Sequence, residues 1–264
     1  MINKLKLTIT VLLSILLINS CYKKKDYITT LQTDSSSNKA YLKFINVYTA
    51  LTPSAATIPS GPSVNIFINN VKINGGAVSY GGLFPVSPAY AAVIAAPNTN
   101  IKMIINRPTG PAVAGDTLIN KNYDLAANTY TTVFVTDTFP NPVPQNSLFL
   151  PFPETVDNVR VGFFRARFFN MIPSLDTLEV FSKRLNAVIF KGTLYKNGSE
   201  LIELPTFIIS DTLQLRRVSV PATILASING FFPTSSRIYT VYGIGLITAT
   251  TGSRARTLTS FTNR

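Results

Sequence analysis

The sequence contains 264 residues, with 24 Lys and Arg against 12 Asp and Glu, one cysteine and no histidine. The lack of histidine excludes Ser-His-Asp and Cys-His catalytic centres and most zinc sites, and a single cysteine excludes a disulfide within the chain. The length is sufficient for one large domain or for two of about 100–120 residues each.

The first twenty residues have the features of an export signal. Lys4 and Lys6 give a basic start, Leu7–Ile18 is an apolar run, and two small polar residues follow it. A permanent membrane-spanning helix needs about 20 apolar residues, so the run is short for an N-terminal anchor helix, which is the alternative interpretation. We therefore predict that residues 1–20 are a signal peptide.

Cys21 stands directly after this segment. The segment Ile18-Asn19-Ser20-Cys21 resembles the lipobox of bacterial lipoproteins, in which the cysteine is acylated and becomes the mature N-terminus. It differs at Ile18, where Leu is commonest, and at Asn19, where a small or β-branched residue is usual. A lone cysteine can also serve as a buried apolar residue. The resemblance predicts that acyl chains on Cys21 hold the protein to the membrane, since each buried methylene contributes about 0.8 kcal/mol.

Residues 21–39 are polar, and we predict that they form a flexible tether between the lipidated Cys21 and the folded part. Lys23–Lys25 either contact anionic lipid headgroups or are simply solvated. The other basic residues are scattered, which together with an exported location argues against nucleic acid as a partner. Bacterial lipoproteins that are displayed on the cell surface often have an acidic run after the cysteine, so the basic segment favours the periplasmic face of the outer membrane over the cell surface.

From Ala40 onward, short runs rich in Val, Ile, Phe, Tyr and Thr alternate with clusters of Pro, Gly, Asn and Ser. Runs of this length bounded by turn residues are typical of sandwiches and barrels, and no helical pattern competes with them. The predicted strands are 41–48, 63–68, 71–73, 89–95, 100–105, 130–137, 159–169, 177–182, 188–194, 200–204, 212–217, 222–228 and 238–249.

Two domains are predicted from the distribution of proline. Residues 140–157 include Pro140, Pro142, Pro144, Pro151 and Pro153 and are expected to form an interdomain linker. The fold class is therefore expected to be all-β, with two tandem immunoglobulin-like β-sandwich domains at 40–139 and 158–264.

The two predicted domains also resemble each other. Three short segments of the first recur in the same order in the second, which favours an internal duplication. The matched segments are Leu42–Val47 with Ala166–Met171, Val64–Phe67 with Leu178–Phe181, and Tyr130–Phe134 with Tyr239–Tyr242.

A strand ending in Phe-x-Asn, a Pro-containing loop, an apolar-polar-apolar-aromatic strand and a closing Tyr-Thr strand resemble the DUF4397 domains of Bacteroidota lipoproteins. The stretch Phe168–Asp176, leading into Leu178–Phe181, is the most similar one. In the first copy, Phe44–Asn46 and Val64–Phe67 correspond, but the connecting loop is longer and lacks an equivalent of Asp176. The resemblance implies immunoglobulin-type sandwiches and supplies no catalytic residue, since the family has no established activity.

The remaining route to catalysis is a pair of carboxylates. Asp176 with Glu179, and Glu200 with Glu203, are spaced closely enough to be considered, but solvated strand faces explain them more simply. No Asp-rich calcium loop and no phosphate-binding glycine loop is found in the sequence. We predict no catalytic residue, no metal and no cofactor.

Aromatic residues are the remaining clue to a ligand. Tyr80, Phe84 and Tyr90 lie around Gly81-Gly82 and are candidates for a carbohydrate-binding platform, although Tyr and Phe also fill sandwich cores and rims. Two apolar segments, Phe149–Pro153 and Phe231–Pro233, either contact partners or close the ends of the domains.

The predicted function is that of a non-enzymatic, lipid-anchored binding or structural module of the cell envelope. Its partners would be the membrane, through the acyl chains, and a glycan or an envelope protein. One alternative is a carbohydrate-capture accessory lipoprotein. Another is an adhesion or assembly subunit that pairs through an exposed β edge.

Overall fold

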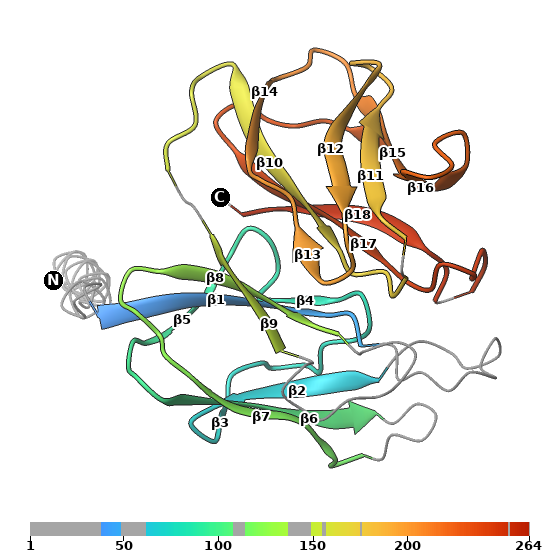
Figure 1. Ribbon diagram of the computed structural model, residues 1–264. Helices are drawn as coiled ribbons and strands as arrows, with labels where there is room; N and C mark the ends of the chain where they lie inside the picture. The colour runs from blue at the N-terminus through green and yellow to red at the C-terminus, as the bar shows by residue number, and fades with distance from the viewer. Residues whose placement is uncertain are drawn as a thin grey trace, which may run out of the picture. The chain divides into compact units, whose positions relative to one another are not determined.

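The structure is a computed structural model that describes residues 38–48, 62–107, 114–136, 149–154, 157–174, 176–252 and 254–263 (Figure 1). These ranges contain eighteen strands and no α-helix, which confirms the all-β prediction. The predicted signal peptide, Cys21 and almost all of the tether lie outside the described residues.

The first half of the described chain forms two sheets. Sheet A has the strand order β4-β1-β8-β9, with β5 also paired to β1, and sheet B has the order β3-β2-β6-β7. The strands of sheet A are β1 (Lys39–Asn46), β4 (Leu83–Phe84), β5 (Ala91–Ile94), β8 (Tyr130–Val135) and β9 (Phe149–Glu154). Those of sheet B are β2 (Ser63–Ile68), β3 (Val71–Lys72), β6 (Thr99–Arg107) and β7 (Thr117–Tyr123).

The second half forms two further sheets. Sheet C has the order β13-β10-β17-β18, with β14 also paired to β10, and sheet D has the order β12-β11-β15-β16. The strands of sheet C are β10 (Phe163–Asn170), β13 (Asn197–Gly198), β14 (Ile202–Pro205), β17 (Ile238–Ile244) and β18 (Thr257–Thr262). Those of sheet D are β11 (Leu178–Ser182), β12 (Ala187–Thr193), β15 (Asp211–Arg217) and β16 (Ile224–Phe231).

The two halves have the same topology. Each strand of the first half has its counterpart nine strands later, in the same sheet position and with the same neighbours. The first strand pairs in parallel with the eighth in both, Tyr41 lying opposite Tyr130 and Arg165 opposite Ile238. The topology supports the duplication, but the register aligns Tyr130 with Ile238, one residue before the Tyr239 that sequence similarity selected.

Alternation of apolar and polar residues explains the core of each half. In β2 the side chains of Val64, Ile66 and Ile68 point inward and their neighbours do not, as the period of two in a strand requires. They meet Ile101 and Met103 of β6. The second half has its own core of the same kind, which includes Phe164, Phe168, Val180, Leu215 and Val241.

A buried asparagine ends the first strand of each half. Asn46 donates its side-chain N–H to the carbonyls of Pro62 (2.8 Å) and Val78 (3.0 Å), and its Oδ1 accepts the backbone N–H of Tyr48. Asn170 likewise donates to the carbonyl of Thr193 (2.9 Å) and accepts from the residue two positions later. A buried amide without such partners would cost about 1–3 kcal/mol, which explains why both copies of Phe-x-Asn have this residue.

A third apolar cluster joins sheet A to sheet C. Its members come from both halves, so Asn38–Arg264 form one compact unit. The buried members are Ile45, Val47, Phe134, Phe169, Met171, Tyr242, Ile244 and Phe261.

The structure differs from the predicted linker at 140–157, because Phe149–Glu154 form the strand β9. This strand pairs with β8, and Phe149 enters the core of the first half. Pro151 and Pro153 are compatible with a strand here because β9 lies at the edge of sheet A, where a residue without an N–H donor is tolerated. The first half therefore extends to Glu154.

Candidate functional site

The predicted aromatic platform is not assembled by the structure. Phe84 packs against the core of the first half, whereas Tyr80 packs against the cluster between sheets A and C. Tyr90 lies edge-on to Tyr130, with ring centroids 5.1 Å apart. Pairing of β4 with β1 takes the segment after Gly81-Gly82 onto sheet A, so the three rings enter three different environments.

A buried lysine marks an unusual electrostatic environment in the unit. Lys43, on β1, has its Nζ 4.4 Å from the ring centroid of Tyr90 and 4.7 Å from that of Phe261. Burial lowers the pKa of Lys43 from 10.5 to about 8, and the carboxylate of Glu154 partly offsets this effect. Such a shift is common at active sites, although structural ion pairs produce it as well.

The surroundings of Glu154 indicate a structural role for this cluster. Its carboxylate accepts hydrogen bonds from Thr132 Oγ1 (2.5 Å) and Asn263 Nδ2 (2.9 Å), and it pairs with Arg167. Thr132 and Glu154 belong to the first half, and Arg167 and Asn263 to the second. Because the carboxylate is almost fully buried and its oxygens are occupied, the cluster links the two sheets and offers no surface to a substrate.

The second half has a different kind of candidate at one end, which we call the loop end. It consists of four connections: 157–162 before β10, 183–186 between β11 and β12, 206–210 between β14 and β15, and 232–237 between β16 and β17. Hydrogen bonds hold them together. Thr206 N and Oγ1 donate to the carbonyl of Gly162 (2.9 and 3.0 Å), and Gly162 N donates to Ser235 Oγ (2.8 Å).

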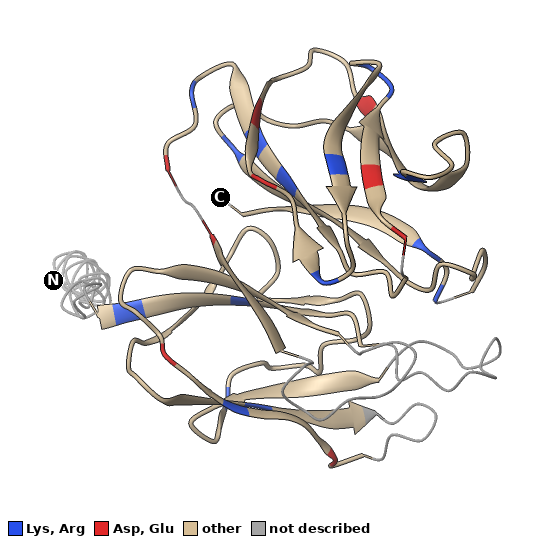
Figure 2. Cartoon of the chain, in the orientation of Figure 1, with Lys and Arg blue, Asp and Glu red and all other residues tan. Residues whose placement is uncertain are grey.

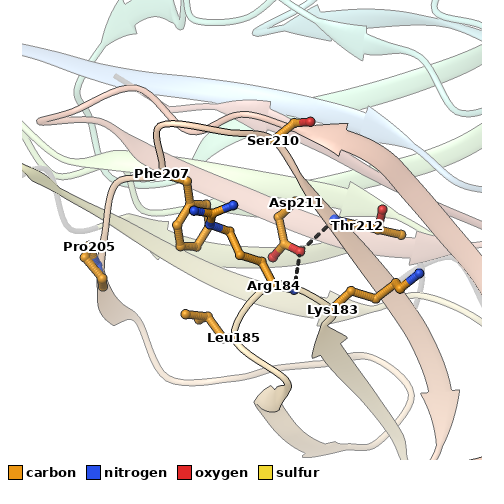
Figure 3. Close-up of a pocket in the computed structure, with 8 residues that line it drawn as sticks. All are labelled: Lys183, Arg184, Leu185, Pro205, Phe207, Ser210, Asp211 and Thr212. Atoms are coloured by element: carbon orange, nitrogen blue, oxygen red, sulfur yellow. Dashed lines mark hydrogen bonds between the residues drawn. The ribbon is translucent and has the colours of Figure 1, made fainter.

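An open cavity of about 630 Å³ lies at the loop end (Figure 3). Its lining combines basic, apolar and hydroxyl side chains with a single carboxylate. The lining residues are Lys183, Arg184, Leu185, Pro205, Phe207, Ser210, Asp211 and Thr212.

Asp211 is a buried residue whose hydrogen bonds fix the shape of the cavity. Its carboxylate is buried and accepts the backbone N–H groups of Arg184 (2.9 Å) and Thr212 (2.7 Å), and also the hydroxyl of Ser182. Three bonds of this kind satisfy a carboxylate that would otherwise be costly to bury. Asp211 therefore fixes the β11–β12 turn and does not face a ligand as a free acid.

Aromatic contacts continue this support to the surface. Phe207 packs edge-on against Phe164 of the core, with ring centroids 5.9 Å apart. The guanidinium of Arg184 lies 5.3 Å from the ring centroid of Phe207 (Figure 3). A guanidinium over an aromatic face is held favourably, so Arg184 is positioned by the core through one ring.

Apolar side chains protrude from the loops around this cavity. The exposed fractions are 93% for Ile208, 88% for Val161, 64% for Ile209 and 57% for Phe232. Single exposed apolar residues are ordinary, but several at one end of a domain indicate an interaction surface.

The four connections of the loop end contain four basic residues, Arg160, Lys183, Arg184 and Arg237, against one acid, Asp157 (Figure 2). Next to it, Glu203 of β14 pairs with Arg160 (2.6 Å) and Arg165 (3.2 Å), whereas Asp157, the one acid within the four connections, is exposed and lies 4.0 Å from Arg165. Three exposed basic side chains make no ion pair or hydrogen bond with any residue that the structure describes. They are Lys183, Arg184 and Arg237.

The first half supplies an internal comparison for this surface. Its β2–β3 connection is the two-residue turn Asn69-Asn70, both residues with positive φ, and its β5–β6 connection is Ala95–Asn98. The corresponding connections of the second half contain Lys183-Arg184-Leu185 and Phe207-Ile208-Ile209. Because the same topology closes with Asn-Asn and Ala-Ala-Pro-Asn in the first half, the fold does not require the basic and large apolar residues found in the second.

Three of the four carboxylates considered from the sequence, Asp176, Glu179 and Glu203, are engaged with arginines, and Glu200 is exposed. Glu179 faces Arg216 (3.5 Å), and Asp176 faces Arg217 (3.0 Å). Within the described ranges there is no group of three or more Cys, Asp or Glu side chains that could hold a metal ion. Within the same ranges, no helix is long and apolar enough to cross a membrane.

Sequence reasoning missed the loop end. Phe207–Ile209 lie between two predicted strands, and an apolar run in a connection, near the basic pair Lys183-Arg184, was the available signal. The predicted apolar segment Phe231–Pro233 is divided by the structure, with Phe231 in the core and Phe232 exposed. That division follows from the alternation of side chains at the end of β16.

Comparisons with known proteins give little. No family model and no curated protein matches the chain. One solved structure that it is similar to is a leucine-rich repeat protein from Bacteroides thetaiotaomicron, at 11% sequence identity over 77% of this chain, with a TM-score of 0.19. The chain spans 26% of the length of that protein, and a likeness of this size carries no argument about fold or function.

Proposed function

We propose that this chain is a lipid-anchored protein of the bacterial cell envelope whose folded part binds other molecules and catalyses no reaction. The observation that carries the proposal is the position of Cys21, the only cysteine, directly after the basic and apolar segment that ends at Ser20. Acyl chains on this residue would provide the membrane anchor.

The proposal extends to location and family. The basic Lys23–Lys25 segment favours the periplasmic face of the outer membrane, where it would lie near anionic headgroups. The repeated nine-strand topology supports two related copies of one domain, and we propose that these are DUF4397-like domains of the immunoglobulin type.

The contacts of the charged residues support binding over catalysis. Asp176, Glu179, Glu203 and Asp211 are each engaged by arginine or backbone partners, which leaves them in structural roles. The loop end, in contrast, has exposed apolar tips and unpaired basic groups. We propose that the loop end is the binding surface.

Lipidation is tested by expressing the full-length chain in a bacterium that processes lipoproteins. Mass spectrometry of the purified protein should show an N-terminus at Cys21 with acyl chains attached. Cys21→Ser should leave the protein in the soluble fraction of the envelope, whereas Ser20→Ala, which keeps a small residue before the cysteine, should remain with the membrane. An intact Met1 or an unmodified Cys21 thiol in the wild type contradicts the proposal.

A further inference from the structure

We infer that the loop end of the second half binds the surface of an anionic lipid bilayer and gives the protein a second membrane contact besides Cys21. The inference rests on the proposed envelope location for its biological setting. The contact itself depends only on the described residues of the loop end.

The shape of the apolar part favours a bilayer over a protein groove. Ile208 and Val161, the most exposed of the four tips, are 93% and 88% exposed, so their side chains project from the loops and do not line a concave surface. Projecting apolar side chains can enter the boundary between headgroups and acyl chains without a complementary pocket in the partner.

The charges select the kind of bilayer. Lys183, Arg184 and Arg237 have no acidic partner among the described residues, and the nearby Asp211 is occupied by three hydrogen bonds. Asp157, the one exposed acid of the loop end, lies 4.0 Å from Arg165 and leaves these three basic groups in excess. Each basic residue close to an anionic membrane surface strengthens binding by about fivefold. An anionic bilayer therefore satisfies both the apolar tips and the basic groups of this surface.

The contacts of the loop end hold these groups in place before binding, so that docking should cost little conformational entropy. Phe207 is packed against the core, Arg184 is held over Phe207, and Thr206 is bonded to Gly162. A surface that is already fixed in its binding shape loses little conformational entropy when it docks. The first half lacks this device at the corresponding connections.

The experiment uses the mature chain with Cys21→Ser, produced without residues 1–20, so that no acyl chain contributes. Vesicles of phosphatidylcholine, alone or mixed with phosphatidylglycerol, serve as the probe in sedimentation. We expect binding to the mixed vesicles, weakened by salt, and weaker binding to pure phosphatidylcholine. Adding Lys183→Ser and Arg184→Ser should reduce binding to the mixed vesicles by an order of magnitude or more, that is by about fivefold for each basic residue.

Insertion can be observed directly because the chain contains no tryptophan. Ile208→Trp should show a blue-shifted emission and quenching by brominated lipid with the mixed vesicles. Ile94→Trp is the matched control, since Ile94 is 73% exposed but belongs to the first half, and its emission should not change. Lys102→Ser with Lys191→Ser is the matched control for charge, and it should keep nearly all of the binding.

Several results would overturn the inference. One is a folded wild-type surface that does not sediment with mixed vesicles; another is equal binding by the Lys183→Ser, Arg184→Ser variant. A concentration-dependent dimer that disappears in Ile208→Ser, Ile209→Ser would show that a second copy covers the surface instead. Acylation of Cys21 without vesicle binding rejects this inference alone, whereas vesicle binding without acylation rejects the proposed anchor alone.

Discussion

Lys43 and Arg167 occupy equivalent positions on β1 and β10, and both interact with the single carboxylate of Glu154. The repeated Phe-x-Asn motif identified these strands, and the hydrogen bonds of the buried asparagines at their ends explain why the motif ends in Asn. It could not identify the charge cluster, because Glu154 lies in a segment whose prolines suggested a linker. Only the edge position of β9 makes a strand with two prolines possible.

Lys43 makes folding stability depend on pH in the alkaline range. The folded state releases the Lys43 proton near pH 8, whereas the unfolded chain keeps it until about 10.5, so the unfolded state binds more protons between these values. Stability therefore rises with pH through this window. Tyr242, whose pKa is raised to about 12 by burial, acts in the opposite direction above the ordinary tyrosine pKa of 10.

We predict that urea unfolding of the wild type shows a gain of about 2 kcal/mol between pH 7.5 and pH 9.5, and that Lys43→Met lacks this gain. The matched control is Lys102→Met, which removes a lysine from the outer face of sheet B and should keep the wild-type profile. Parallel profiles for the wild type and Lys43→Met would show that Lys43 is not the titrating group.

At the scale of elements, the alternation of apolar and polar residues predicted most of the strands. Several of those it missed form because they pair with a neighbouring strand, and their own sequences carry little strand signal. β7 has the sequence TLINKNY, which contains two asparagines, and asparagine is depleted in strands. Its Asn120 and Asn122 both accept hydrogen bonds from Asn100 of β6, which compensates for that weak preference. β4 and β13 have two residues each and carry no periodic signal of their own. The loop end escaped prediction for the same reason, since it is assembled from four connections distant in sequence.

The loop end should separate into a supporting part and a dispensable part when its stability is measured. Phe207→Ala removes a ring that contacts Phe164 and should cost about 1–3 kcal/mol, less than the loss for a fully buried ring. Ile208→Ser changes a side chain that is almost entirely in water and should stay within about 0.5 kcal/mol of the wild type. Urea unfolding at neutral pH measures both. A large loss for Ile208→Ser would mean that the tip packs within the fold and is not free to meet a partner.

For the whole molecule, the contact between the halves has approximate twofold character. Phe134 and Tyr242 are equivalent by strand register, and their rings meet with centroids 5.6 Å apart. Glu154 and Asn263 are also equivalent by strand register, and a hydrogen bond of 2.9 Å joins them. Contact between equivalent positions is the mark of an isologous interface, as in a symmetric dimer. The duplicated chain therefore packs its two copies against each other through the same face of each.

The symmetry is broken at the charged positions, and this difference favours pairing of unlike halves. Two copies of the first half would bring two Glu154 carboxylates together, whereas two copies of the second would leave Arg167 without an acid. The single carboxylate between two basic residues satisfies both only when the first half meets the second. Sequence comparison could match the two copies. It could not show that Glu154 and Asn263 occupy equivalent positions, because that equivalence depends on the register of β9 and β18.

Glu154→Gln should consequently weaken the contact between the halves more than it lowers the stability of either half by itself. The amide keeps partners for Thr132 and Asn263 but leaves the buried Lys43 and Arg167 without their counter-charge, a change that costs about 3–5 kcal/mol. In calorimetry the wild type should unfold in one transition, and Glu154→Gln should show two, because each half retains its own core. Asn263→Ala removes neutral hydrogen bonds with Glu154 and Thr240 and no counter-charge, should cost about 1 kcal/mol, and should keep the single transition. A single unshifted transition for Glu154→Gln would mean that the apolar cluster around Phe134 and Tyr242 joins the halves without help from the charges.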